Sequence, residues 1–374
     1  MSAIQRQNID KYAISFADKN ISKADNIKYT VAMILMVLVA ASYGCHSVNS
    51  KAISPDADTV FYRINTSIRI LENQFWKQGL QFLREKKRKM TKVNSYIIVD
   101  DTHESYTGKL RKKEKNAEEK LTNEEKQILR YIHKYKLNKG DTGSYKYLVF
   151  AIVYGNKRKV LRVKAVKRKE NCDGFIIKTL HAIKKEVSYE CALFDRGFYD
   201  GLFIEKLKRN QIPFILRARI SDHMKKIFGF YSKWKCYRDF EIGEHKVKGD
   251  LVLGVDFAEG KRTKWAFITN MEFDNWYKVR DLYRKRWDIE NVFKATDGIQ
   301  LRAQTSNPTT RLFCVCLSFL FYNAWQSKNK RGTLLNFVMN ALEGIFELIA
   351  DTVAFYRDKL KLNLPFWDRI VSSA

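Results

Sequence analysis

The chain has 374 residues, and 45% of them are hydrophobic, which is enough for a buried core and for two or three domains. It carries 69 Lys and Arg against 41 Asp and Glu, a formal net charge of +28. Because this excess is spread along the chain, it predicts a polyanionic partner, DNA or RNA first and an anionic membrane second. The six cysteines show no zinc-type spacing. A reducing compartment fits them, and a disulfide framework does not.

Residues 1–93 are expected to form a helical DNA-binding domain. The apolar run 29–44 has a core too short for a membrane span, so we interpret it as a buried helix. A further helix is expected after Ser54, a suitable N-cap that Pro55 follows. Two helices around a loop in a basic chain permit a helix-turn-helix module, although many helical domains show the same pattern.

From residue 94 the pattern changes to alternating strands and helices. The order is β-β-β-α-β-α-β, which is that of the ribonuclease H-like fold, and the predicted fold class is therefore α/β. The expected strands are 95–101, 145–155, 159–168, 189–197 and 213–220, and the expected helices are 121–137, 175–186 and 200–211. The expected divisions are 94–218 for the first part of this core, 219–278 for a β-strand insertion, and 279–374 for the completion of the core with C-terminal helices.

Three carboxylates stand at positions where they can meet. Asp100 ends the first strand and Asp195 ends the fourth, and these strands are neighbours in the expected fold. Glu290 can reach them from a helix that packs across the sheet. Three carboxylates without Cys or His nearby suit Mg²⁺ or Mn²⁺, and two such ions can activate a water or a 3′ hydroxyl at a phosphodiester. Asp101 is the alternative to Asp100, and the two side chains should point to opposite faces of the strand.

Residues 283–298, "YRKRWDIENVFKATDG", read as a helix with an unusual polar stripe. Five of its residues fall within about 80° of one another at about 100° per residue. These are Tyr283, Arg286, Glu290, Lys294 and Asp297, with Trp287 at the edge. One interpretation is a surface ladder of i,i+4 ion pairs. The other is a catalytic stripe, in which cations and aromatic rings that hold a DNA strand flank one metal-binding Glu.

These motifs resemble those of the DDE transposases of the insertion-sequence-four group. Their signature is Tyr-x2-Arg-x3-Glu-x6-Lys, and Tyr283, Arg286 and Glu290 match it in register. The stretches "VDDT" and "FDRG" resemble the first and second Asp motifs, and "KWAFITN" resembles a strand of the β insertion. The resemblance covers residues 94–325, and more loosely the N-terminal helices.

The resemblance implies a role for each of these residues. Asp100, Asp195 and Glu290 would bind two Mg²⁺ or Mn²⁺ ions and catalyse the reaction. Trp265 would stack on a base that leaves the duplex, although it could also be a core aromatic. The remaining candidates for DNA binding are Tyr283, Arg286, Trp287, Lys294 and Arg196, and for the last of these an ion pair with Asp195 is the alternative.

One position departs from the signature. Asp297 stands where the family has its final Lys, and a carboxylate there would repel a phosphate. Lys294, one turn earlier on the same stripe, could replace that cation. Alternatively, the departure is a sign of lost activity.

The function predicted from the sequence is a DNA transposase. It would bind transposon ends and target DNA, act as a homodimer, cleave by metal-assisted hydrolysis and join 3′ hydroxyls by transesterification. The alternatives are a catalytically decayed DNA-binding protein, a ribonuclease H-like nuclease that cuts without joining, and a basic membrane-surface protein. The expected location is the cytoplasm, at the nucleoid of a prokaryotic-type cell.

Overall fold

The computed structural model is described for most of the chain between residues 64 and 327. The described residues are 11–21, 64, 66–91, 93–108, 121–135, 137–230, 234–244, 246–258, 261–297, 305–327, 333–334 and 337–338. The chain divides into two compact units, each described by itself. The first comprises Met1–Thr66, Ala295–Thr305 and Phe313–Ala374, and the second comprises Ser67–Lys294 and Ser306–Leu312.

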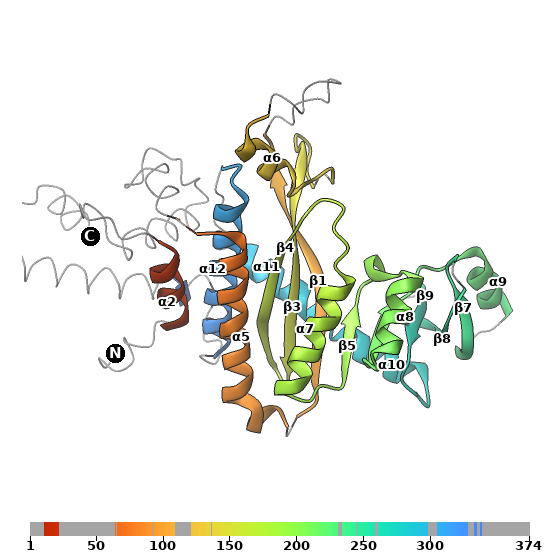
Figure 1. The fold of residues 1–374 in the computed structure, drawn as a ribbon. Coiled ribbons are helices and arrows are strands. Elements are labelled where there is room, and N and C mark those ends of the chain that lie inside the picture. Colours follow the sequence, from red (N-terminus) through yellow and green to blue (C-terminus); the bar gives the residue numbers. More distant parts are fainter. Residues whose placement is uncertain are drawn as a thin grey trace, which may run out of the picture. The chain divides into compact units, whose positions relative to one another are not determined.

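The second unit is a mixed α/β structure in which nine strands of the described residues form one sheet (Figure 1). Their order is β2-β3-β1-β5-β6-β9-β8-β7. Strand β4 pairs with β3 on the side that faces away from β1, next to β2. The strands are β1 (Ser95–Tyr106), β2 (Ile132–His133), β3 (Gly143–Tyr154), β4 (Lys157–Val166), β5 (Cys191–Phe194), β6 (Phe214–Arg217), β7 (Trp234–Ile242), β8 (Val247–Ala258) and β9 (Lys261–Thr269). The five strands expected between 95 and 220 are all present, although their ends differ by several residues.

Strand β1 is an internal strand of this sheet, between β3 and β5. Its apolar start, Ile97 to Val99, is fully buried, as expected of a strand covered on both faces. It is antiparallel to β3 along its whole length and parallel to β5. The pairing with β3 continues to Tyr106, so β1 is five residues longer than its apolar pattern predicted. Cross-strand hydrogen bonds, rather than side-chain polarity, determine where this strand ends.

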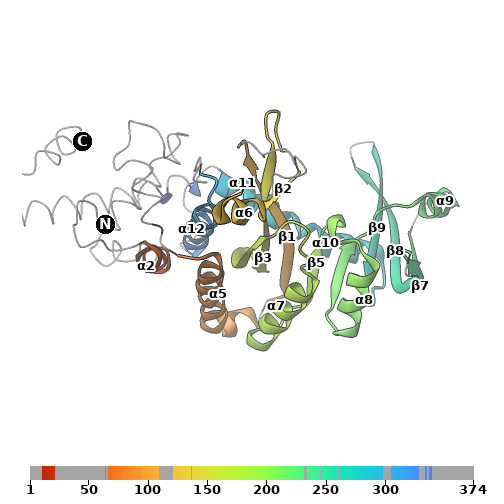
Figure 2. The ribbon, with the colours of Figure 1, turned by 45° about the horizontal axis from the view of Figure 1, so that its top comes forward.

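Helices cover both faces of the sheet. Helices α5 (Ile68–Met90) and α7 (Asp173–Glu186) lie on one face, and α10 (Trp276–Arg284) and α11 (Trp287–Asp297) lie on the other (Figures 1 and 2). At Gly79, α5 approaches β4 so closely that a Cβ would lie 2.2 Å from the Leu161 carbonyl oxygen. Helix α8 (Gly201–Arg209) connects β5 to β6.

The start of α5 differs from the prediction. Ser67, in extended conformation, accepts a hydrogen bond from the Ile70 N–H and caps this helix. Ile64 lies in an isolated β-bridge with Ile21, so no single helix runs from Ser54 into α5. Ser54 itself and the apolar run 29–44 lie outside the described residues.

Residues 219–278 extend the central sheet instead of forming a sheet of their own. β9 pairs with β6 in antiparallel register, Arg217 opposite Phe267, and β8 and β7 follow outward. A short helix that the sequence did not predict, α9 (Asp222–Phe230), precedes β7. The helix expected over 121–137 is shorter than predicted. Helix α6 spans Asn123–Leu129, and β2 follows it and pairs with β3.

The described parts of the first unit are helical. They include α2 (Lys11–Asn20) and most of α12 (Pro308–Ser327). Phe16 and Phe313 stack with their ring centroids 5.6 Å apart. Although α12 is strongly apolar, no helix among the described residues has the length and hydropathy of a membrane span.

Candidate active site

Two of the predicted carboxylates lie on neighbouring parallel strands, Asp100 within β1 and Asp195 just after β5. Val99 of β1 pairs with Phe194 of β5, and Asp100 and Asp195 are the next residues of the two strands. Asp195 precedes a short 3₁₀ turn, Arg196–Phe198, and its side chain is partly exposed. The parallel register therefore places these two residues next to each other, at the point where β5 ends.

Arg286 joins the third carboxylate to the first. Its Nη1 donates to Asp100 Oδ2 at 2.8 Å, and its Nη2 donates to Glu290 Oε1 at 2.5 Å. The Arg286 side chain is only 6% exposed and that of Asp100 12%, whereas Glu290 is 40% exposed. The Tyr283 hydroxyl points to Asp195 Oδ1 at 3.5 Å, the limit of a hydrogen bond. The signature residues thus contact all three predicted carboxylates.

A break in the helix brings Arg286 inward. The single helix expected over 283–298 is wrong, because α10 ends at Arg284 and α11 begins at Trp287. The Lys285 and Arg286 N–H groups bond to carbonyls three residues earlier, which tightens the turn. Arg286 and Tyr283 are consequently buried rather than part of a surface ladder, and Glu290 pairs with Arg286 rather than with Lys294.

The electrostatics favour a bound cation at this place. Burial raises the pKa of the Asp100 carboxyl to about 7, against the opposing effect of Arg286, and the negative charge of Asp195 raises it further. Burial removes water that would otherwise solvate the ionised carboxylate. A nearby positive charge compensates for this loss and stabilises the ionised form. Burial also raises the pKa of Tyr283, which keeps its hydroxyl protonated as a hydrogen-bond donor.

Asp101 faces the opposite side of β1. It forms an ion pair with Lys146 and lies beside Cys172 and Phe203, in a separate pocket of about 290 Å³ on the face covered by α7 and α8. The expected alternation of the two side chains is therefore found, and only Asp100 lies with Arg286 and Glu290.

Trp265 packs against the signature residues. Its ring lies 5.7 Å from that of Phe267 and 6.4 Å from that of Tyr283, measured between centroids, and the Arg217 guanidinium lies 4.7 Å from its ring. Its indole N–H is buried and has no hydrogen-bond partner among the described residues. Trp265 thus lies beside Tyr283 in the candidate site, with an N–H donor for which the described residues supply no acceptor.

The other predicted DNA-binding residues lie at the surface. Trp287 is 59% exposed, and Lys294 and Arg196 are also exposed. Within the part of the chain that the structure describes, Arg196 forms no ion pair with Asp195. Asp297 is the last residue of α11 and is exposed, one turn beyond Lys294.

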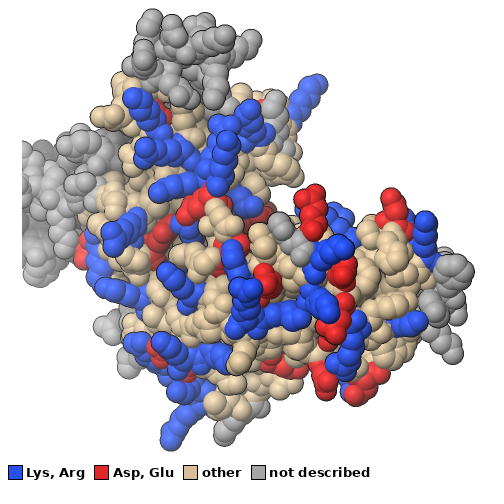
Figure 3. All heavy atoms as spheres, turned by 45° about the vertical axis from the view of Figure 1, so that its right-hand side comes forward, with Lys and Arg blue, Asp and Glu red and all other residues tan. Residues whose placement is uncertain are grey.

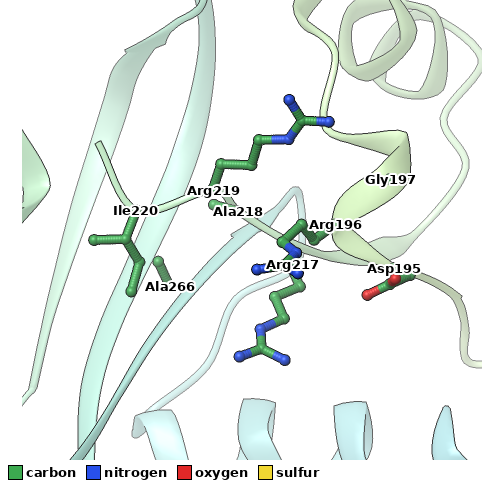
Figure 4. Close-up of a pocket in the computed structure, with 8 residues that line it drawn as sticks. All are labelled: Asp195, Arg196, Gly197, Arg217, Ala218, Arg219, Ile220 and Ala266. Atoms are coloured by element: carbon green, nitrogen blue, oxygen red, sulfur yellow. The ribbon is translucent and has the colours of Figure 1, made fainter. Parts of the chain in front are cut away.

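Sequence reasoning missed two arginines near Asp195. Arg217 ends β6, and Arg219 follows it in the loop. Both line a cavity of about 650 Å³ together with Asp195 and Arg196 (Figure 4). The signal was present in "FILRARI", where two arginines at alternate positions follow an apolar strand that precedes the insertion.

The donor set suits a hard divalent cation. Asp100 and Glu290 offer carboxylate oxygens, and the Arg286 guanidinium between them occupies the place of a cation. In the described ranges, no three His, Cys, Asp or Glu side chains are gathered closely enough to hold a metal ion as they stand. The carboxylates are chemically suited to bind a metal ion. In this structure Arg286 contacts both Asp100 and Glu290.

The sequence of residues 92–316 matches the family described as transposase DDE domain. The chain belongs to this family. All three carboxylates, Tyr283 and Arg286 lie within the matched range. DDE transposases generally use divalent metal ions, in agreement with the oxygen-rich site. No curated protein matches the sequence.

The fold is similar to that of a transposase of known structure. A cryo-EM structure of the piggyBac transposase synaptic complex with hairpin DNA matches with a TM-score of 0.52 at 11% sequence identity. The match covers 98% of this chain and 82% of the other. At this identity the likeness concerns the fold, and together with the family match it supports a transposase.

Proposed function

We propose that this protein cleaves DNA at transposon ends and joins the resulting 3′ hydroxyls to target DNA, with Asp100, Asp195 and Glu290 as the metal-binding catalytic residues. The observation that carries the proposal is the Arg286 bridge between Asp100 and Glu290, beside Asp195. This bridge supports the proposal, because a positive charge already lies between two carboxylates that would hold metal ions in a phosphoryl-transfer site. Mg²⁺ or Mn²⁺, two ions in this proposal, would activate the attacking oxygen and stabilise the leaving oxygen.

The ribonuclease H-like core belongs to this proposal. Strands β4-β3-β1-β5-β6 lie side by side, with β3 antiparallel to β1 and both β5 and β6 parallel to it. This order, with α7 and α8 as the crossover helices, supports the assignment. In such a core, substrate binds where adjacent parallel strands end.

The side chains around the carboxylates have separable roles. Arg286 would exchange its contact with Glu290 for a DNA phosphate, since the same guanidinium N–H that donates to the carboxylate can donate to a phosphate oxygen. The Tyr283 hydroxyl would exchange its long contact with Asp195 for a hydrogen bond to the same strand, and the Trp265 ring would stack on a base. Trp287, Lys294 and Arg196 would contact the strand from the surface.

The charge of the molecule supports a DNA partner. Lys and Arg are spread over the face seen in Figure 3, with acidic side chains between them. A net charge of +28 over such a surface favours association with a polyanion through counterion release. The homodimeric synaptic complex that we propose would hold two transposon ends on two copies of this surface.

Strand cleavage and joining on a labelled duplex with the element's own flanking ends tests the proposal. We expect nicking and joining with Mg²⁺ or Mn²⁺, loss of both with Glu290→Gln, and retention with Glu205→Gln, which removes an exposed carboxylate of α8. Metal-dependent cutting without joining would instead indicate a nuclease. Salt-sensitive binding without any cleavage would indicate a decayed, DNA-binding transposase.

A further inference from the structure

The cavity beside Asp195 has the size and lining of a nucleotide site. Its volume of about 650 Å³ lies within the range of about 300–1,000 Å³ that is typical of small-ligand pockets. One wall is the turn Asp195–Gly197, and the facing wall is the segment from Arg217 to Ile220, with Ala266 at the base (Figure 4). Such a hollow accepts one nucleotide of a strand and is too small for a duplex.

The facing wall is fixed by the sheet. Arg217 is opposite Phe267 in the antiparallel pairing of β6 with β9, and the Ala218 N–H donates to the Ala266 carbonyl at 2.8 Å. The Arg217 guanidinium lies on the face of the Trp265 ring, 4.7 Å from its centroid. Arg217 is therefore held in place before any ligand arrives.

The charge of the cavity is unbalanced. Within the described part of the chain, Arg196, Arg217 and Arg219 form no ion pair, whereas most other arginines near the site pair with a carboxylate. Asp195 is the one acidic residue of the lining. Arg217 and Arg219 extend in different directions from the same segment (Figure 4). A strand that crosses the cavity would meet one guanidinium after the other.

Apolar side chains line another part of the cavity. Ala218, Ile220 and Ala266 offer contact for a sugar or a base, but no hydrogen bond that would select a base. The ligand chemistry is therefore a phosphodiester chain rather than a particular sequence.

We propose that this cavity is a subsite for an unpaired DNA strand next to the scissile phosphate, in which Arg217 and Arg219 bind successive phosphates. The inference rests on the proposed function, because Asp195 links the cavity to the catalytic carboxylates. Arg217 and Arg219 are not part of the transposase signature. In this proposal the DNA strand beside the cleavage point is unpaired and passes through the cavity.

The test is the binding of a labelled single-stranded oligonucleotide of about ten nucleotides, a length typical of single-strand sites, followed by fluorescence anisotropy. We expect Arg219→Gln and Arg217→Gln each to weaken binding about fivefold. Each should also reduce the slope of log affinity against log salt by about 0.7, the value for one phosphate contact on a single strand. Arg168→Gln is the matched control, because it removes an exposed guanidinium from a turn outside the cavity.

Further arms separate the possible outcomes. Unlabelled oligonucleotide should displace the probe, whereas full displacement by millimolar pyrophosphate would show a small-anion site and overturn the strand assignment. Equal effects of Arg219→Gln and Arg168→Gln would overturn the role of the cavity. Melting curves of each variant check that it folds, and Arg217→Lys, which keeps the charge, should recover most of the affinity.

The cleavage assay distinguishes this inference from the proposed function. If wild-type protein cleaves transposon ends while the cavity variants bind single strands normally, the subsite is wrong and the transposase stands. If wild-type protein cleaves nothing but Arg219→Gln still weakens single-strand binding, the subsite stands without the catalytic assignment.

Discussion

Arg286 holds Asp100 with a buried hydrogen bond of 2.8 Å, although the two residues come from opposite ends of the catalytic region. The same guanidinium binds Glu290. One guanidinium therefore lies between two carboxylates and offsets part of the repulsion between them. We propose that this arrangement stabilises the carboxylates until DNA and metal replace the arginine contacts.

Arg286→Gln should destabilise the metal-free protein. Removing one partner of a buried ion pair leaves an uncompensated charge and typically costs about 3–5 kcal/mol, so we expect the free energy of unfolding to fall by about 3 kcal/mol. Urea unfolding measures this loss. Arg284→Gln is the control, since Arg284 is 49% exposed and its ion pair with Asp256 should contribute about 0–1 kcal/mol. Equal losses in the two variants would contradict the role of the Arg286 bridge.

Substitutions of the adjacent residues Asp100 and Asp101 should have different effects on metal binding. We expect Mg²⁺ or Mn²⁺ to raise the melting temperature of the DNA-free protein, because an ion at 100 times its Kd stabilises by about 2.7 kcal/mol. Asp100→Asn should remove this rise. Asp101→Asn should retain it, because Asp101 faces Lys146 on the other side of β1. Calorimetric metal titration of the same proteins provides the second readout, and loss of binding in Asp101→Asn alone would contradict the proposed ligand set.

The sequence predicted the elements that depend on local patterns. The apolar strands β1, β3, β4, β5 and β6 were all expected, and so was the convergence of Asp100 with Asp195, which follows from strand order alone. It did not predict the continuation of β1 to Tyr106, because that length comes from pairing with β3.

Features that depend on tertiary contacts were not predictable in the same way. The break between α10 and α11 lies in a stretch with uninterrupted helical spacing, and no Gly or Pro marks it. The break coincides with the burial of Tyr283 and Arg286, and the periodicity of the sequence alone does not contain the contacts that these side chains make with the sheet. The assignment of Arg217 to the site likewise required the position of β9 next to β6.

Glu72 should make stability depend on pH. It lies on α5, accepts a hydrogen bond from the Ala165 N–H, and has its pKa raised above the ordinary 4.5 by burial. The folded state therefore binds a proton that the unfolded state releases at lower pH. The stability that this proton provides is complete below the unfolded pKa and is lost as pH rises through the folded one.

Glu72→Gln isolates this effect, because its amide oxygen still accepts from Ala165. We expect the melting temperature of wild-type protein to fall relative to that of Glu72→Gln as pH rises from about 4 to 7. Glu85→Gln, at an exposed position of the same helix, is the control. A constant difference between wild type and Glu72→Gln across this range would show that Glu72 does not titrate as described.

Asp297→Lys should strengthen the binding of transposon-end DNA. Asp297 is exposed at the end of α11, where the signature that the sequence resembles has a lysine, and its carboxylate would repel a phosphate that approaches this end of the helix. Replacing it with lysine changes the local charge by two units and adds one phosphate contact, so the slope of log affinity against log salt should steepen by about 0.9 on duplex DNA. Lys294→Ala should have the opposite effect if Lys294 supplies the missing cation. Anisotropy titrations at several salt concentrations measure both, and unchanged affinity in Asp297→Lys would mean that the DNA does not pass this end of the helix.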